Sequence, residues 1–416
     1  MRAALDKAFG GTVGLVRVLL LFESALYSAV TPVLPHYAKT LHAGKPAVGL
    51  LAAAYTLGLL PGSVLGGWIA ARLGVCRTTL IGLVVFAFAV AGFGFAASLT
   101  SLDLLRAVQG VACGLIWGGA LTWVIAVTPV AQRGATLGSV IGAATLGTLI
   151  GPLLGTIAVA TSTALVFSAV GFISLGLAAW VRAQPHPTPL RETLPIKGSR
   201  PALRSPAARG LFLGGWMILL EAMTIGATNA LLPLRLARFG ASALLIGVAF
   251  LGAAALSTAL STMIGRATDR HGPRPPITIG LLLSAILIPA LALPHSPALL
   301  VIVAVVALGG PMTGYMIPAV STMTDSAEHL GIALVVTSTL FNLAYAAGET
   351  IGAPAAAVVS QASSDAVALV GLGVLMLLTL IPARNLRRPP AASADAEERP
   401  EREPARRPDP AVAVPG

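Results

Sequence analysis

The sequence predicts an all-α, polytopic membrane protein with twelve transmembrane helices in two pseudo-symmetric bundles of six. Three observations predict this class: the composition, the length of the apolar runs and a repeat between the two halves of the chain. Hydrophobic residues make up 56% of the 416 residues, charged residues only 10%, and the mean hydropathy is +0.86. A soluble domain usually carries about 25% charged residues, so the composition indicates a protein of the lipid bilayer.

The apolar runs, bounded by Pro, Gly and charged residues, define the predicted helices. A bilayer core of roughly 30 Å requires about 20 apolar residues per helix. In chain order the predicted helices span 11–36, 47–70, 78–98, 102–127, 135–158, 162–181, 210–234, 243–265, 277–294, 298–323, 331–358 and 366–382. Runs of this length are too long for barrel strands, and only helices satisfy their own backbone in hydrocarbon.

Lys and Arg residues concentrate in one set of the loops between these helices. With the amino terminus in the cytoplasm, the cations of the outer loops are Lys39, Lys45, Arg235 and Arg238, and the other loop and tail cations lie inside. This asymmetry follows the positive-inside rule and predicts that both termini are cytoplasmic. It also accounts for the net charge of +11, so no nucleic-acid partner is expected. The first apolar run is too long for a cleavable signal peptide and is predicted to be retained.

Composition changes along the chain predict four segments. A six-helix bundle is expected over 11–182, and a second one over 210–383. The segment 183–209 is rich in Pro and basic residues, which is typical of a polar cytoplasmic linker. Residues 384–416 mix Pro, Ala, Glu and Arg without apolar periodicity, which predicts a disordered cytoplasmic tail.

The two predicted bundles match each other without gaps at an offset of 198 residues. The matched pairs include Glu23 and Glu221, Pro35 and Pro233, Gly67 and Gly265, Arg72 and Arg270, and Gly74 and Gly272. A shared offset for an acid, a proline and a Gly-Arg-Gly turn indicates duplicated halves. Parallel repeats of six helices are typical of secondary transporters whose substrate site lies between the halves near the midplane.

Over residues 11–382 the chain resembles the major facilitator superfamily. Gly265, Asp269, Arg270, Gly272 and Arg274 fit the family's G-x-x-x-D-R-x-G-x-R loop between the eighth and ninth helices. The resemblance implies that Asp269, Arg270 and Arg274, together with Arg72 of the first-half copy, act in gating. The first-half copy has Ala71 where the family has Asp, so the intact gating loop is expected in the second half.

Further motifs resemble proton-coupled members of that family. Arg106 and Gln109 fit the R-x-x-Q-G of the fourth helix, and Thr31–Pro35 is similar to the P-x-x-P of twelve-helix drug:proton antiporters. The fifth helix resembles the antiporter glycine pattern, with Thr156 in place of its last glycine. The residues that fit this pattern are Gly138, Gly147, Gly151, Pro152 and Gly155. The resemblance implies exchange of protons for an exported compound.

Three acids lie inside predicted helices: Glu23, Glu221 and Glu349. A charge at a helix centre costs about 2.5–3.5 kcal/mol on insertion scales, so such residues usually face the bundle interior and carry function. Burial disfavours the ionised form of a carboxylic acid, which allows it to bind and release a proton. We expect these acids and Arg106 to couple transport to protons, mainly in the first half. The alternative for each acid is a structural hydrogen bond to a neighbouring helix.

Aromatic and amide side chains inside the predicted helices are candidates for the substrate site. They are Tyr27, Trp117, Asn229, Tyr315, Asn342 and Tyr345. Together with the acids they would suit an amphipathic or cationic organic molecule, through ion pairing and cation–π contact. The alternative for the aromatic residues is packing or anchoring at the membrane interface.

The function predicted from these features is proton-coupled efflux of small organic, drug-like compounds. Two alternatives remain: an uptake symporter or facilitator for a sugar, organic acid or other metabolite, and a non-transporting sensor of the same fold. An enzyme is not expected, since the sequence has no Walker G-x-x-x-x-G-K-[ST], G-x-S-x-G or H-E-x-x-H motif. We expect a monomer in the plasma (inner) membrane that needs no cofactor or metal, with protons, the lipid bilayer and a small-molecule substrate as partners.

Overall fold

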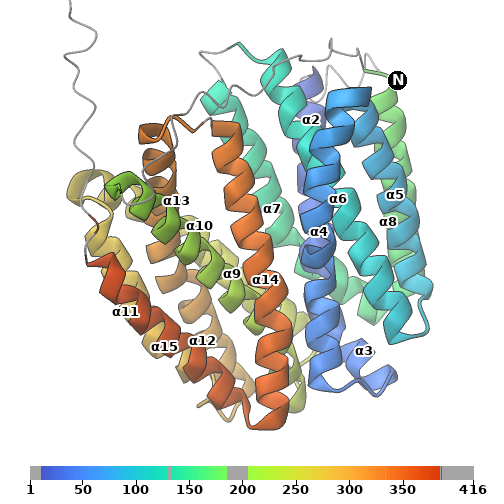
Figure 1. Ribbon diagram of the computed structural model, residues 1–416. Helices are drawn as coiled ribbons and strands as arrows, with labels where there is room; N and C mark the ends of the chain where they lie inside the picture. Colours follow the sequence, from blue (N-terminus) through green and yellow to red (C-terminus); the bar gives the residue numbers. More distant parts are fainter. Residues whose placement is uncertain (1–10, 130–132, 185–204, 333, 385, 387–416) are drawn as a thin grey trace, which may run out of the picture.

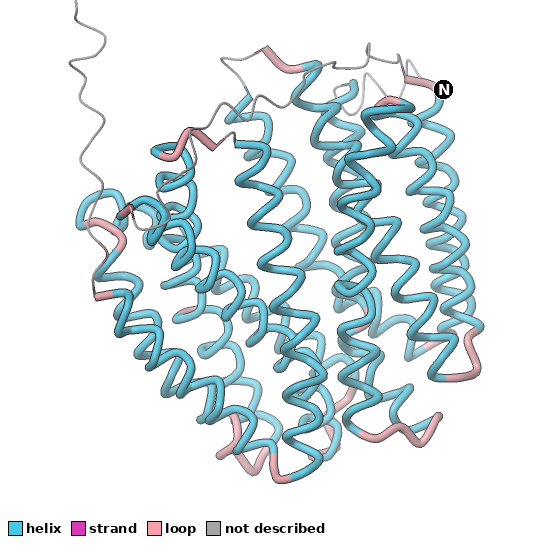
Figure 2. The backbone as a smooth tube through the Cα atoms, viewed as in Figure 1, coloured by secondary structure: helices cyan, strands magenta, loops and turns pink. Residues whose placement is uncertain are grey.

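The computed structural model describes residues 11–129, 133–184, 205–332, 334–384 and 386. Within these ranges all regular structure is helical, as predicted (Figure 2). The helices in chain order are α2 (Gly11–Ala29), η1 (Thr31–Val33), α3 (Leu34–Thr40), α4 (Lys45–Leu73), α5 (Val75–Phe95), α6 (Leu99–Val127), α7 (Arg133–Ala160), α8 (Thr163–Arg182), α9 (Pro206–Arg238), α10 (Ala243–His271), α11 (Arg274–Ala290), α12 (Pro297–Gly309), α13 (Pro311–His329), α14 (Leu334–Ala362) and α15 (Asp365–Ala383). Most of the predicted linker, and the predicted tail beyond Leu386, lie outside the described residues.

Serine residues fix the starts of six of the described helices. In each case the serine Oγ accepts a hydrogen bond from a backbone N–H of the first turn, and the serines are Ser98, Ser162, Ser205, Ser242, Ser296 and Ser364. The first N–H groups of a helix have no partner within the helix, so a serine cap satisfies one of them.

Two predicted helices are interrupted in the structure. The first, predicted over 11–36, ends as α2 at Ala29 and continues through η1 and α3, because Pro32 and Pro35 lack the N–H that a regular helix needs. The tenth, predicted over 298–323, is divided into α12 and α13 at Gly310 and Pro311 for the same reason.

The predicted loop between the eighth and ninth helices is mostly helical. Asp269 and Arg270 lie in the last turn of α10, and Arg274 is the first residue of α11, so the connection consists of Gly272 and Pro273. Gly272 has a φ of 83°, a conformation that glycine adopts at little cost. The sequence predicts a loop after Gly265 because the apolar run stops there, whereas α10 continues with polar residues to His271.

Two hydrophobic cores divide the described chain into a first half, α2–α8, and a second half, α9–α15. One core gathers buried residues from Leu15 to Val181, and the other gathers residues from Met217 to Ala383. Figure 1 shows the helices of the first half, coloured from blue to bluish green, beside those of the second half, coloured from yellowish green to red. Each half therefore folds around its own apolar interior.

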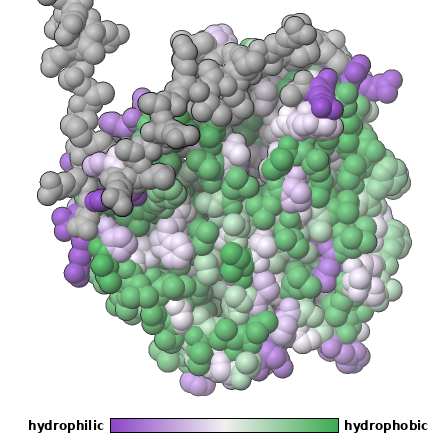
Figure 3. Space-filling view, in the orientation of Figure 1, coloured by the Kyte–Doolittle hydropathy of each residue, from purple (hydrophilic) through white to green (hydrophobic). Residues whose placement is uncertain are grey.

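On the face that Figure 3 shows, apolar side chains cover much of the surface between the two ends of the molecule. Phe88, Phe95 and Phe172 have exposed fractions of 68%, 70% and 74%. An apolar surface of this kind is stable in lipid rather than in water. Ten helical segments of the described chain are long and apolar enough to cross a membrane. They exclude α11, with 17 residues, and α14, so twelve spans stay a prediction.

The halves meet mainly along two helix pairs, α4 with α14 and α7 with α10, and α9 adds smaller contacts with α3 and α4. In the α4–α14 interface, a Cβ on Gly49 would lie 2.6 Å from the Cβ of Ala357. In the α7–α10 interface, a Cβ on Gly247 would lie 3.0 Å from Thr156 Oγ1. Gly49 and Gly247 occupy the same position of the internal repeat, so the two interfaces are built alike.

Candidate functional site

The three predicted acids are buried in the structure. Glu23 lies on α2 in the first half, whereas Glu221 on α9 and Glu349 on α14 belong to the second half. Their exposed fractions are 3%, 8% and 2%. Carboxylates buried to this extent need hydrogen-bond donors, cations or protons to compensate them. The groups around each acid therefore decide what the site can do.

Glu23 accepts hydrogen bonds from two aromatic side chains of its own half. The Tyr55 hydroxyl of α4 donates to Oε1, and Trp117 Nε1 of α6 donates to Oε2 over 2.7 Å. Trp117 is among the predicted substrate-binding residues, and the structure makes it a direct partner of the acid. Tyr55 is missing from the predicted set, although a tyrosine inside an apolar run is itself a signal, because a buried hydroxyl needs a partner.

Arg106 lies beside Glu23 and is 3% exposed. Its Nη2 donates to the backbone oxygen of Tyr27 over 2.7 Å, and its Nη1 donates to Gln109 Oε1 over 2.9 Å. The guanidinium lies 4.4 Å from the ring centroid of Tyr55. The R-x-x-Q pair is thus one hydrogen-bonded unit that holds a cation next to the acid.

Glu349 connects the two halves. The Tyr27 hydroxyl of α2 donates to Glu349 Oε1, and Asn229 Nδ2 of α9 lies 3.5 Å from the same oxygen. Glu349 Oε2 is buried and has no hydrogen-bond partner among the described residues. Tyr27 and Asn229 are predicted substrate-binding residues, and the structure brings both to one carboxylate. This acid is therefore shared by both halves.

Glu221 has fewer partners than its repeat counterpart Glu23. Tyr315 occupies the repeat position of Trp117, is fully buried, and is close enough to Glu221 to interact electrostatically. The positions of Tyr55 and Arg106, however, are taken by alanines, Ala253 and Ala304. Glu221 Oε2 accordingly has no hydrogen-bond partner within the described chain. The second half therefore has the acid and one aromatic neighbour, but the described residues give Glu221 no equivalent of the Tyr55 and Trp117 hydrogen bonds or of the Arg106 cation.

Two predicted residues of α14 lie in different surroundings. Tyr345 is close enough to Glu349 and Glu221 to interact with both charges, and its ring stacks on Phe341 at 6.2 Å between centroids. Asn342 is exposed. The helical spacing therefore places Tyr345 with the acids as predicted, whereas Asn342 lies apart from this buried cluster.

The predicted glycine pattern lies where α7 packs on α2. A side chain on Gly147, Gly151 or Gly155 would overlap the backbone oxygens of successive turns of α2, those of Leu21, Ala25 and Ala29. Pro152 of the same helix faces Gly247 of α10, in the other half. Gly138 lies in α7 next to residues whose side chains are not described. α7 therefore connects the helix of Glu23 to the second half.

The predicted gating residues lie at the opposite ends of the helices from Lys45. Arg72 stacks over Trp68 of its own helix, 4.0 Å from the ring centroid. Asp269 and Arg274 line a cavity of about 1600 Å³ together with Arg209 and other residues of the second half. Arg270 is exposed near them.

This architecture defines a class of protein. A helical bundle with an apolar exterior, two halves with separate cores, and buried acids where those halves meet is a multi-pass membrane transporter. The chain belongs to the Major Facilitator Superfamily, whose sequence profile matches residues 18–348 and 215–414. The family consists of transporters and not enzymes.

Similar sequences include two drug-resistance proteins. Multidrug resistance protein 1 of Bacillus subtilis is 26% identical over 299 residues, which cover 70% of this chain and 76% of that protein. Quinolone resistance protein NorA of Staphylococcus aureus is 30% identical over 152 residues, which cover 36% of this chain and 39% of NorA. The match to NorA thus spans well under half of that relative.

Solved structures support the same fold. A bacterial homologue of the human lysosomal transporter Spinster, in an inward-facing and unoccupied conformation, has a TM-score of 0.75 at 14% identity and covers 91% of this chain and 98% of its own. The nucleoside transporter NupG has a TM-score of 0.71 at 12% identity, covering 90% and 100% of the two chains. At this identity the likeness concerns the fold alone.

Proposed function

We propose that the protein exports small amphipathic or cationic organic compounds in exchange for protons, by alternating access. It spans the plasma (inner) membrane as a monomer with twelve helices in two bundles, 11–182 and 210–383. The segment 183–209 is a cytoplasmic linker, and both termini are cytoplasmic. The exchange uses no cofactor, because the gradient of protons supplies the free energy.

The balance of buried charges carries this proposal. Glu23, Glu221 and Glu349 lie in one cluster, and among the described residues the one buried cation of this cluster is Arg106. If all three acids were ionised, two negative charges would stay uncompensated in a low-dielectric interior, which is strongly unfavourable. Protons can neutralise them in one state, and a cationic substrate can do so in another. Such an alternation is the physical requirement for antiport.

The surroundings of the acids support coupling in the first half. Glu23 has two aromatic hydrogen-bond donors and lies beside Arg106. Small movements of α4 or α6 therefore change directly how well its negative charge is stabilised. Glu349 adds a hydrogen bond across the halves through Tyr27, which links its charge to their relative position. The multidrug relatives support an organic, drug-like substrate.

The contacts between the halves support an inward-facing state. Lys45, Thr56 and Thr156 of the first half contact Asp365, Thr350 and the backbone of Ala243. Lys45 lies at the helix ends that are predicted to be on the outer side of the membrane. Arg72 and Asp269 lie at the other ends, where opening towards the cytoplasm would expose the acids.

Transport in inverted vesicles tests the proposed exchange. With an acidic interior, protons leave through the protein and should drive uptake of an organic cation. A gradient of about one pH unit corresponds to about 1.4 kcal/mol per proton, so electroneutral one-for-one exchange of a monovalent cation should give about tenfold accumulation. The measurement compares cationic, neutral and anionic compounds, with a proton ionophore and protein-free vesicles as controls.

The direction of proton movement separates the alternatives. Uptake that requires protons to leave supports antiport, whereas uptake together with protons supports the symporter. Uptake that the ionophore leaves unchanged supports a facilitator. Binding without any net or exchange flux would contradict transport and favour a sensor.

Replacing Asp269 by Asn is expected to slow turnover by about two- to fivefold, the size of effect that one exposed charge typically has on an equilibrium between two states. The residue is exposed at the end of α10, beside the basic start of α11, so the change leaves the buried acids intact. Initial rates of exchange measure the effect. Glu328→Gln removes an exposed acid from α13 and serves as the control. Equal rates in both variants would show that the α10–α11 connection serves topology only.

A further inference from the structure

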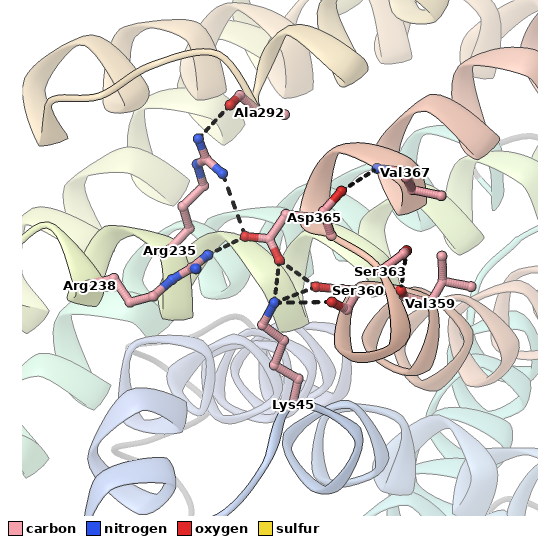
Figure 4. Close-up of polar contacts among 10 residues, drawn as sticks. Lys45, Arg235, Arg238, Ala292, Val359, Ser360, Ser363, Asp365 and Val367 are labelled. Atoms are coloured by element: carbon pink, nitrogen blue, oxygen red, sulfur yellow. Dashed lines mark hydrogen bonds and ion pairs between the residues drawn. The ribbon is translucent and has the colours of Figure 1, made fainter.

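The α4–α14 interface carries a cluster of charges at its outer end, far from the α10–α11 connection. Asp365, the first residue of α15, lies at the centre of this cluster and is 6% exposed (Figure 4). A carboxylate this well buried is stable only with close cationic or hydrogen-bonding partners. No sequence motif described above includes it.

Four side chains compensate Asp365. Lys45 Nζ lies 2.7 Å from Oδ1, and Arg235 Nη1 lies 3.5 Å from Oδ2. Arg238 pairs with Oδ2, and the Ser360 hydroxyl donates to Oδ1. Lys45 also donates to Ser360 Oγ over 2.6 Å. The cluster therefore consists of interlocking hydrogen bonds as well as opposite charges.

Only one of these partners comes from the first half. Lys45 is the first residue of α4, whereas Arg235 and Arg238 end α9 and Ser360 lies near the end of α14. When the halves separate at this end, Asp365 keeps both arginines and the serine. Lys45 is 23% exposed and can be taken up by water. The contact can therefore open without leaving a buried charge unpaired.

The equivalent place in the other interface has no such charges. Ala243, the first residue of α10, corresponds to Lys45 in the repeat, and α8 begins with Thr163 where α15 begins with Asp365. There the link is a hydrogen bond from Thr156 Oγ1 to the backbone oxygen of Ala243, 3.2 Å long. Gly49 and Gly247 allow similarly close packing in the two interfaces, but the ion pair of Lys45 and Asp365 belongs to the α4–α14 interface.

We propose that Lys45 and Asp365 form a second gating site, which holds the outer side closed and is released each time the outward-facing state forms. Arg235, Arg238 and Ser360 position Asp365 for this contact. The inference rests on alternating access but not on the identity of the substrate or on proton coupling. It places gating residues on both sides of the membrane.

Distances between spin labels test this site directly. Thr100 and Ala298 are exposed positions in the first turns of α6 and α12, one in each half and at the outer end. Labels on Thr100→Cys and Ala298→Cys, with Cys76 and Cys113 replaced by alanine, report the separation of the halves. Pulsed electron paramagnetic resonance in lipid nanodiscs gives the fraction of molecules in which the two labels are far apart. Lys45→Met should raise the ratio of long to short distances about two- to fivefold.

Two controls show whether a shift in distances comes from loss of the ion pair. The first excludes a general effect of removing a positive charge, and the second excludes an effect of misfolding. Lys39→Met removes an exposed cation from α3 at the same end and should leave the distribution unchanged. Raising the salt concentration should shift the parent protein in the direction of Lys45→Met and leave Lys45→Met itself unmoved. The salt experiment needs no substitution at Lys45, so it holds even if that variant folds poorly.

The outcomes distinguish this proposal from the proposed function. If the parent protein shows both distances but neither salt nor Lys45→Met changes their ratio, the gating site is wrong and alternating access stands. If a single distance persists in every sample, both the gating site and alternating access are contradicted. If the parent protein shows no proton-driven transport while salt and Lys45→Met shift the distances as expected, only the proton coupling is contradicted.

Discussion

Glu23→Gln is expected to abolish accumulation driven by a pH gradient while the protein still folds and still exchanges substrate between the two sides. Glutamine keeps an oxygen that can accept from Tyr55 or Trp117, so the packing around the residue is preserved. It cannot bind or release a proton at physiological pH. The negative charge that Arg106 and the protons compensate is then permanently lost from the first half.

Two assays on the same vesicles measure this effect. Accumulation under an imposed pH gradient should fall to the level of protein-free vesicles, whereas counterflow of labelled against unlabelled substrate should persist. Asp103→Asn, an acid near the start of α6, provides a control that should keep both activities. Full gradient-driven accumulation in Glu23→Gln would remove Glu23 as the coupling residue, and loss of counterflow as well would point to substrate binding.

Gly151→Val is expected to be the most damaging of the glycine substitutions in α7. The Cβ alone would overlap Ser28 Oγ and the backbone oxygen of Ala25, and Ser28 is also held by a hydrogen bond of 3.0 Å to the backbone oxygen of Thr148. Because these atoms belong to helix backbone or are fixed against it, α2 and α7 must move apart. Overpacking of this kind costs about 1–3 kcal/mol or more.

Gly142→Val provides the matched control for this substitution. Gly142 lies in the same helix, is exposed, and has no neighbouring atom within 4 Å of an added Cβ. Both variants lose the same backbone freedom and gain the same β-branched side chain. Thermal unfolding in detergent and counterflow should therefore be impaired by Gly151→Val alone. Equal effects in the two variants would mean that helix propensity, and not the α2–α7 contact, is what the glycine serves.

Much of the candidate site can be predicted from single residues that are energetically unfavourable in lipid. An acid inside an apolar run is conspicuous in the sequence because its cost in hydrocarbon must be compensated, and Glu23, Glu221 and Glu349 are all buried in the structure. The glycines of α7 are conspicuous for a similar reason. Small residues at every fourth position indicate close helix packing, and the structure shows α2 as the partner.

The partners of those residues could not be predicted in the same way. Helices of this chain are apolar on nearly all sides, since one side faces lipid and the other faces protein. Without a polar side, the periodicity that reveals the buried face of a soluble helix is absent. The hydrogen bonds of Tyr55 to Glu23 and of Tyr27 to Glu349 depend on how the helices are rotated against one another. The sequence likewise indicates only that Lys45 is a cation of an outer loop, because its pairing with Asp365 also depends on how the helices pack.

The sequence alone determined that this protein is a helical membrane protein with repeated halves, because long apolar runs can only span lipid as helices and a repeat is visible as matching residues. It also determined which residues carry unusual chemistry. The tertiary structure decided which of them meet: Glu349 with Tyr27 across the halves, Glu221 without a counterpart of Arg106, and Asp365 with Lys45 at the outer end. Those contacts join residues up to 322 positions apart in the chain, and only the packing of helices against each other fixes them.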